Sequence, residues 1–310
     1  MKRQRGVALL IALLVVALAT ILIAGLLDRG GLATARTRNA LREMQAENYA
    51  KGLEDYAARV LWLDEQNSDG SDASDDIWGV PMPPTPVPGG IITATMSDLD
   101  GRFNLNNLST ANLNSGAWKG KFVLLLQALK LDTNLAQNVQ DWLSTDPSSG
   151  ASEAWYLAQA VPYRPGRRQF SHVSELRMVQ GFDGDTYARI VPHVSALPVG
   201  TTININTATV PVLMTLRDSP PLTEQEAAAI WQQGHAHFNK LTDLNQSPYN
   251  VFLNSPTPMY GVSSQFFLAH GDITLDGLPF SFYSLLQRSL GGGAGANGGI
   301  FVLQRSRGGE

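Results

Sequence analysis

The stretch Val7–Leu27, VALLIALLVVALATILIAGLL, decides how this chain is organised. Its 21 positions hold only Ala, Leu, Ile and Val, apart from Thr20 and Gly25. At a rise of about 1.5 Å per residue, a helix of this length spans the roughly 30 Å hydrocarbon layer of a bilayer once. The sequence therefore predicts a single transmembrane segment, residues 7–27, close to the N-terminus.

The charges that flank this segment predict its orientation. Lys2, Arg3 and Arg5 precede it, and Asp28 follows it. Positively charged flanks stay on the cytoplasmic side of a membrane. We therefore expect a cytoplasmic N-terminus and a body that lies in the periplasm.

Three interpretations of this N-terminus compete: a plain anchor, a cleaved secretory signal, and a prepilin leader, which is cut before the apolar run. A secretory signal has an apolar region of about 7 to 15 residues that ends at a cleavage site of small residues. The run here is longer, and it continues into residues 28–63, which lack proline and carry apolar residues at near-helical spacing. We therefore expect one helix to pass from the membrane into the body.

The composition excludes several classes of function and of stabilisation. The 310 residues carry a formal net charge of -4 and contain no cysteine. Because binding to phosphates needs a basic surface, we expect no nucleic acid partner. Without cysteine, neither disulfides nor thiolate zinc sites can hold the fold. Packing must stabilise it, with or without a hard cation that is bound by oxygen atoms.

The segment after the N-terminal helix reads as loop and then as strand. Asp64–Asp76 is rich in Asp, Asn, Ser and Gly, and Pro81–Gly90 is rich in proline, so both predict loop or linker. Ile91–Met96 and Arg102–Leu105 lie on either side of a turn signal, and they predict a short antiparallel pair.

Helical patterns then dominate residues 121–245, and strand patterns return after them. Asp276–Gly277 has the composition of a hairpin turn between two strands, and Ile300–Gln304 reads as a last strand. The expected fold class is α+β, with a small discontinuous antiparallel sheet assembled from segments on both sides of a helical insertion.

Short motifs along the chain resemble those of the minor pseudopilin K family of type II secretion systems. The longest is DLDGRFNLNNL at Asp98–Leu108. The other matching segments are Asp141–Leu143, Pro162–Arg164, Val173–Arg177 and Thr202–Ala208. The basic leader, Gly6 and the apolar run are also similar to the class III leader of type IV pilins and pseudopilins.

This resemblance implies a pilin-like fold with a large inserted all-helical domain of two SAM-like units, near residues 105–195 and 203–250. The expected segments are a leader at 1–6, the transmembrane segment at 7–27, the rest of the N-terminal helix at 28–63, a linker with the first strands at 64–104, the inserted domain at 105–255 and the last pseudopilin strands at 256–310.

The resemblance also implies processing of the N-terminus. Prepilin peptidase is expected to cut after Gly6 and to leave Val7 as a methylated N-terminus. Most members of the superfamily have glutamate at the fifth mature position, where this chain has Ile11. In those relatives the carboxylate neutralises the N-terminus of a neighbouring subunit, and a carboxylate in lipid is costly without a partner. A subunit that lacks it suits the end of a filament.

The resemblance thus implies a tip subunit that initiates and caps the periplasmic pseudopilus for export of folded proteins across the outer membrane. The expected partners are minor pseudopilins I and J, further pseudopilins, and prepilin peptidase. The expected location is the inner membrane, crossed once, until the subunit is extracted into the pseudopilus. The alternative is a permanently anchored periplasmic adaptor, which would keep Met1.

Calcium is the cofactor that the residues allow. It takes carboxylate and carbonyl oxygens from loops and needs no cysteine or histidine, and the family resemblance also suggests calcium in the helical domain. The candidate ligands are Asp141, Asp146 and Glu153, which bracket a Pro-Ser-Ser-Gly loop. The alternative is that they belong to a helix C-terminus, a solvated turn and a helix cap.

No motif predicts an enzyme. The sequence lacks H-E-x-x-H, G-x-S-x-G and P-loop patterns. His235 and His237 lie two positions apart with no third ligand nearby in the sequence, so we interpret them as surface residues. The expected role is assembly without catalysis.

Overall fold

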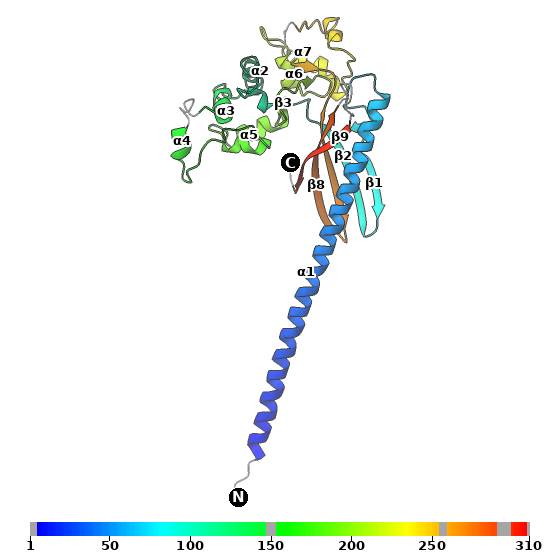
Figure 1. Ribbon diagram of the computed structural model, residues 1–310, viewed down its shortest axis with the longest axis vertical. Helices are drawn as coiled ribbons and strands as arrows, with labels where there is room; N and C mark the ends of the chain where they lie inside the picture. The colour runs from blue at the N-terminus through cyan, green and yellow to red at the C-terminus, as the bar shows by residue number, and fades with distance from the viewer. Residues whose placement is uncertain (1–4, 147–152, 254–258, 290–298, 309–310) are drawn as a thin grey trace.

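One helix carries the chain from its N-terminal segment into the body. The computed structural model describes residues 5–146, 153–253, 259–289 and 299–308, and in it α1 runs from Arg5 to Asn67. The first half of α1 projects from the body, and the second half lies along the sheet (Figure 1). Its apolar window has a mean hydropathy of 3.2 and is not buried at all, so α1 is long and apolar enough to cross a membrane.

The sheet has five antiparallel strands from two separate parts of the chain. They are β1 (Met82–Val87), β2 (Gly90–Asp98), β7 (Phe266–Leu275), β8 (Leu278–Ser289) and β9 (Gly299–Arg307), in the order β1-β2-β7-β8-β9. Two strands precede the helical insertion and three follow it. The α+β fold class and the discontinuous sheet are therefore confirmed.

Two local expectations were wrong. Pro81–Gly90 was expected to be loop, yet it contains β1. This strand lies at the edge of the sheet and pairs only with β2, so prolines, which lack a backbone N–H, are tolerated in it. Arg102–Leu105 does not pair with β2. Instead, β3 (Phe103–Asn104) pairs in parallel with β4 (Val194–Ser195), and β2 pairs with β1 and β7.

The second half of α1 packs on one face of the sheet through small and aliphatic side chains. Ala57, Val60 and Leu61 are buried with residues of β7 and β8. A Cβ atom on Gly271 of β7 would lie 2.5 Å from Cδ1 of Leu53 on α1, so a larger residue there would require the Leu53 side chain to shift.

The predicted hairpin at Asp276–Gly277 is confirmed. Both residues have positive φ, 48° and 80°, as a tight turn between twisted strands requires. The Asp276 carboxylate also pairs with Arg42 of α1 at 2.8 Å, and this contact attaches the turn to the helix.

Short helices fill the insertion between β2 and β7. They are η2 (Leu105–Leu108), α2 (Ser115–Ala128), α3 (Leu135–Leu143), α4 (Glu153–Leu157), η4 (Val173–Met178), α5 (Gly184–Ile190), η5 (Val191–His193), α6 (Val210–Leu213), η6 (Met214–Leu216), α7 (Glu224–Trp231), η7 (Gln232–Gly234) and η8 (Leu241–Asn245). Their buried side chains form one cluster that extends from Phe103 to Tyr260. The two helical units therefore share a core and form one domain.

Both helical units begin with a buried asparagine that makes the same set of hydrogen bonds. Asn106 follows β3 and accepts from the Phe170 backbone N–H at 2.7 Å, while Asn206 follows β5 (Ile203–Asn204) and accepts from the Phe238 N–H at 2.8 Å. Each amide also donates to the carbonyl of the same phenylalanine and to one further carbonyl. In each unit a buried asparagine thus fastens the opening strand to a loop about 30 to 60 residues later in the chain.

Candidate assembly site and domain junction

The projecting half of α1 presents an apolar surface on every side. The side chains of Val7, Ile11 and Leu14 are exposed by 58%, 58% and 68%, as are all their neighbours through Leu27. Such a surface is stable only in lipid or against other apolar helices. Gly6 and Val7 lie in the first turn of this helix, and cleavage between them stays a prediction.

Exposed apolar side chains continue along α1 beyond the membrane segment. Leu32, Leu41 and Met44 are exposed by 54%, 59% and 58%. They lie among charged residues such as Arg29, Arg36 and Arg38, so the continuous apolar surface ends at Leu27. A helix of a neighbouring subunit can follow α1 along residues 7–27 through apolar contacts.

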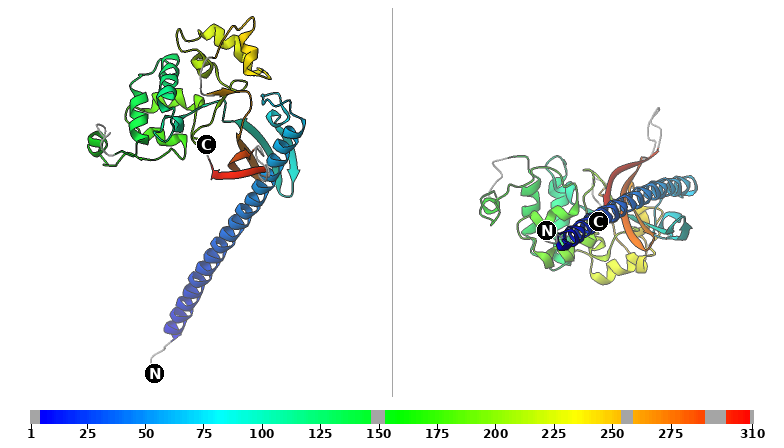
Figure 2. Two further views of the ribbon diagram at one scale, coloured as in Figure 1. Left: turned by 45° about the horizontal axis from the view of Figure 1, so that its top comes forward. Right: turned by 90° about the horizontal axis from the view of Figure 1, so that it is seen from below.

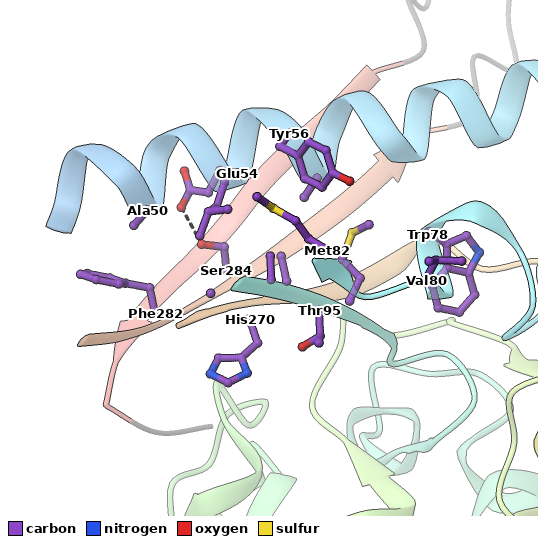
Figure 3. A pocket seen from close by; sticks show the side chains of 16 residues that line it. Ala50, Glu54, Tyr56, Trp78, Val80, Met82, Thr95, His270, Phe282 and Ser284 are labelled. Atoms are coloured by element: carbon purple, nitrogen blue, oxygen red, sulfur yellow. Dashed lines mark hydrogen bonds between the residues drawn. The ribbon is translucent and has the colours of Figure 1, made fainter. Parts of the chain in front are cut away.

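A groove separates α1 from the sheet near β1 (Figure 3). Its main polar group is Glu54, which accepts from Ser284 at 2.5 Å and from Arg305 at 2.7 and 2.9 Å. Burial raises the pKa of Glu54, but the hydrogen bonds from Arg305 and Ser284 outweigh it and the pKa is lowered. The Glu54 carboxylate thus links α1 to β8 and β9 through these hydrogen bonds.

Asp98, in the motif at the end of β2, joins the sheet to the second helical unit. It is buried, and its Oδ2 accepts from Asn204 Nδ2 at 3.1 Å, from Ser264 Oγ at 2.6 Å and from the Thr207 hydroxyl. Its donors come from segments more than 100 residues away in the sequence. The Asp98–Leu108 motif is therefore an architectural junction.

Asp100 makes a second connection two residues later. Its Oδ2 accepts from the backbone N–H groups of Gln265 and Phe266, at 2.5 and 3.1 Å, where β7 begins. Burial, and then the charge of Asp98, raise the pKa of Asp100 to about 8. Burial also raises the pKa of Asp98.

Because the pKa of Asp100 is raised, the free energy of unfolding is expected to decrease between about pH 5 and about pH 8.5. The folded pKa of Asp100 lies above its unfolded value of 3.8, so the folded state binds the proton more tightly, and this contribution is lost as pH rises through the folded pKa. Urea midpoints measured in chelator at both pH values test this. Asp100→Asn should flatten the dependence, and an unchanged slope in that variant would rule out Asp100 as its source.

Arg288 of β8 closes the junction from the side of α1. Its guanidinium is 4% exposed, and it bonds the carboxylates of Asp64 and Asp72, the former at 3.2 Å, and donates to the Ser264 carbonyl at 2.8 Å. Sequence reasoning missed this group. The available signal was a single arginine at the end of the strand segment SLLQRS.

The three predicted calcium ligands lie around α3 and α4 with other partners. Asp141, in the last turn of α3, accepts from Gln137, and Glu153, at the start of α4, pairs with Arg167 at 3.0 Å. The Asp146 carbonyl accepts from the same arginine, and residues 147–152 lie outside the described residues. Glu153 is thus paired with Arg167, and Arg164 lies 3.6 Å from its other carboxylate oxygen. Calcium at these carboxylates stays a prediction.

His235 and His237 differ in their surroundings. His237 Nδ1 lies 3.0 Å from Asp75 and its Nε2 lies 3.6 Å from Asp69, whereas His235 has no side-chain partner among the described residues. Burial lowers the pKa of His237, but the hydrogen bond and charge of Asp75 outweigh it and the pKa is raised. His237 therefore fastens the second helical unit to the loop after α1.

Comparison with known proteins gives consistent matches over most of the chain. A family model described as type II secretion system (T2SS), protein K matches residues 101–199. The chain is 34% identical over 307 residues to the type II secretion system protein K of Pectobacterium carotovorum subsp. carotovorum, covering 93% of each chain. It is 33% identical to the protein of the same description from Pseudomonas aeruginosa, covering 98% of this chain and 93% of that one.

A solved structure has the same fold. The crystal structure of the GspK-GspI-GspJ complex from the type 2 secretion system of enterotoxigenic Escherichia coli contains a chain that superposes with a TM-score of 0.74 at 25% identity. The match covers 89% of the present chain and 100% of the other. The fold of this chain therefore recurs in one chain of that complex.

Proposed function

Because this chain belongs to the type II secretion system protein K family, it is a minor pseudopilin, and we propose that it initiates and caps the tip of the pseudopilus. As a cap, it would serve the export of folded proteins across the outer membrane by limiting filament growth. The proposed mechanism is assembly, and we expect no catalytic activity. The polar side chains at the domain junction support this because they bind one another across the fold.

The position of the helical domain carries the proposal for the cap. It lies at the end of the body away from the projecting half of α1 (Figure 1 and the left view of Figure 2). In a filament held together by parallel N-terminal helices, a further subunit would add at this end. The helical domain would occupy that space, so growth would stop above this subunit.

A single label tests the cap. The chain has no cysteine, and Leu113 of the helical domain is fully exposed, so Leu113→Cys creates one thiol for a gold label. We expect one label at one end of each isolated pseudopilus that carries the variant. Labels distributed along the shaft would contradict the cap.

We also propose that the chain binds minor pseudopilins I and J of its own system, and then further pseudopilins. Support comes from the solved GspK-GspI-GspJ complex, one chain of which shares this fold. The apolar surface of α1 supports the same proposal because it needs either lipid or other helices around it. Replacing lipid by neighbouring helices allows α1 to leave the inner membrane without exposing apolar side chains to water.

Processing by prepilin peptidase between Gly6 and Val7 completes the proposal, with the body in the periplasm before assembly. The mass of the N-terminal peptide of the protein from its native membrane tests this. We expect a chain that begins at a methylated Val7. An intact Met1 would instead support the permanently anchored adaptor.

A further inference from the structure

Three carboxylates converge where α1 ends and the loop to the sheet begins. Asp64 lies in the last turns of α1, and Asp72 and Asp76 belong to the following loop. One carboxylate oxygen from each lies within 4.8 Å of the corresponding oxygens of the other two. Oxygens that bind one calcium-sized ion at about 2.3–2.6 Å lie at most about 5 Å apart, so this spacing fits a shared cation.

Asp72 supplies an independent indication of a missing ligand. The residue is only 2% exposed, and its Oδ2 accepts from the Ser264 N–H at 2.7 Å and from Arg288. Its Oδ1 is buried and has no hydrogen-bond partner among the described residues. A buried carboxylate oxygen without a donor or a cation is costly in free energy.

The local charges are also unbalanced. Arg288 is the buried cation beside Asp64 and Asp72, and Glu65 lies 3.8 Å from its Nε. Three carboxylates therefore lie against one guanidinium, while Asp76 lies within 4.8 Å of oxygens of Asp64 and Asp72 and also of a ring nitrogen of His237. Burial, and then the charges of Asp76 and Asp72, raise the pKa of Asp64 to about 6.

We infer that Asp64, Asp72 and Asp76 bind one divalent cation of the hard, oxygen-preferring class, with calcium as the best fit. Water would complete the coordination. The ion would attach the loop to the end of α1. It would also reinforce the domain junction, because the Asp72 backbone N–H donates to Val262 at 2.8 Å and its carbonyl accepts from Asn204 at 2.9 Å. This site is separate from Asp141, Asp146 and Glu153 in the helical domain.

Calorimetric titration of calcium chloride into the full chain in detergent, after removal of metals with a chelator, tests the inference. We expect saturable binding to the wild-type protein. Asp64→Asn and Asp76→Asn each remove one charged ligand and should weaken calcium binding at least about tenfold. Circular dichroism identifies any variant that fails to fold, and the two substitutions are independent of each other.

Two matched variants locate the ion. Asp75→Asn removes the same charge at the adjacent position, where Asp75 binds His237 instead, and Asp141→Asn removes it in the helical domain. Both should retain the wild-type affinity. Loss of binding in Asp75→Asn would place the ion at His237, and loss only in Asp141→Asn would place it in the helical domain, so either result would overturn the inference. Absence of saturable calcium binding by the folded wild-type protein would also overturn it.

Discussion

Arg288→Met is expected to lower the free energy of unfolding by about 3–5 kcal/mol, because it leaves Asp64 and Asp72 buried without their guanidinium partner. The methionine retains most of the aliphatic volume, so the loss reports the charge and the hydrogen bonds rather than a cavity. Guanidinium chloride unfolding of the full chain in detergent, with chelator present, measures the effect. The decrease should become smaller as the pH falls below about 6, the value to which burial, and then the charges of Asp76 and Asp72, raise the pKa of Asp64.

Arg307→Met is the matched control, on the neighbouring strand. Arg307 is 49% exposed on its side chain and pairs with Glu43 and Glu47, which are themselves substantially exposed. Exposed pairs contribute below about 1 kcal/mol, so this variant should remain close to the wild type. Equal losses in the two variants would mean that burial does not increase the contribution of the Arg288 ion pairs, which would contradict the stabilising role of Arg288.

Asn206→Ala is expected to lower the free energy of unfolding by about 2–4 kcal/mol. Its amide bonds both the N–H and the carbonyl of Phe238, at 2.8 and 3.0 Å, and alanine would leave these buried groups without a partner. Loss of protease resistance should begin in the second helical unit, near the loop that carries Phe238. Urea unfolding and limited proteolysis measure the two effects.

Asn239→Ala controls for the loss of an asparagine from the same loop. Asn239 is exposed and follows Phe238 directly, so its replacement should change stability by less than about 0.5 kcal/mol. The equivalent residue in the first unit, Asn106, makes the same pair of bonds to Phe170, so Asn106→Ala should resemble Asn206→Ala. If neither Asn106→Ala nor Asn206→Ala lowered the free energy of unfolding, the two asparagines would not stabilise their units through these hydrogen bonds.

Sequence alone determined the features that depend on neighbouring residues. Val7–Leu27 predicts a membrane helix because 21 successive positions, all Ala, Leu, Ile or Val except Thr20 and Gly25, leave no other stable environment. The hairpin at Asp276–Gly277 follows from two residues that tolerate positive φ. The motif at Asp98–Leu108 indicated the family, but it did not indicate which atoms its carboxylates bind.

Only the tertiary structure decided the polar contacts at the junction. Arg288 meets Asp64 and Asp72 across more than 200 residues of sequence, and Asp98 meets Ser264 across 166. The parallel pairing of β3 with β4 joins positions about 90 residues apart, which no local strand pattern encodes. The value of a buried polar group depends on which donors and charges the completed fold places around it. Hydrophobic periodicity could therefore predict the helix, whereas the partners of these carboxylates emerged only once the whole chain had folded.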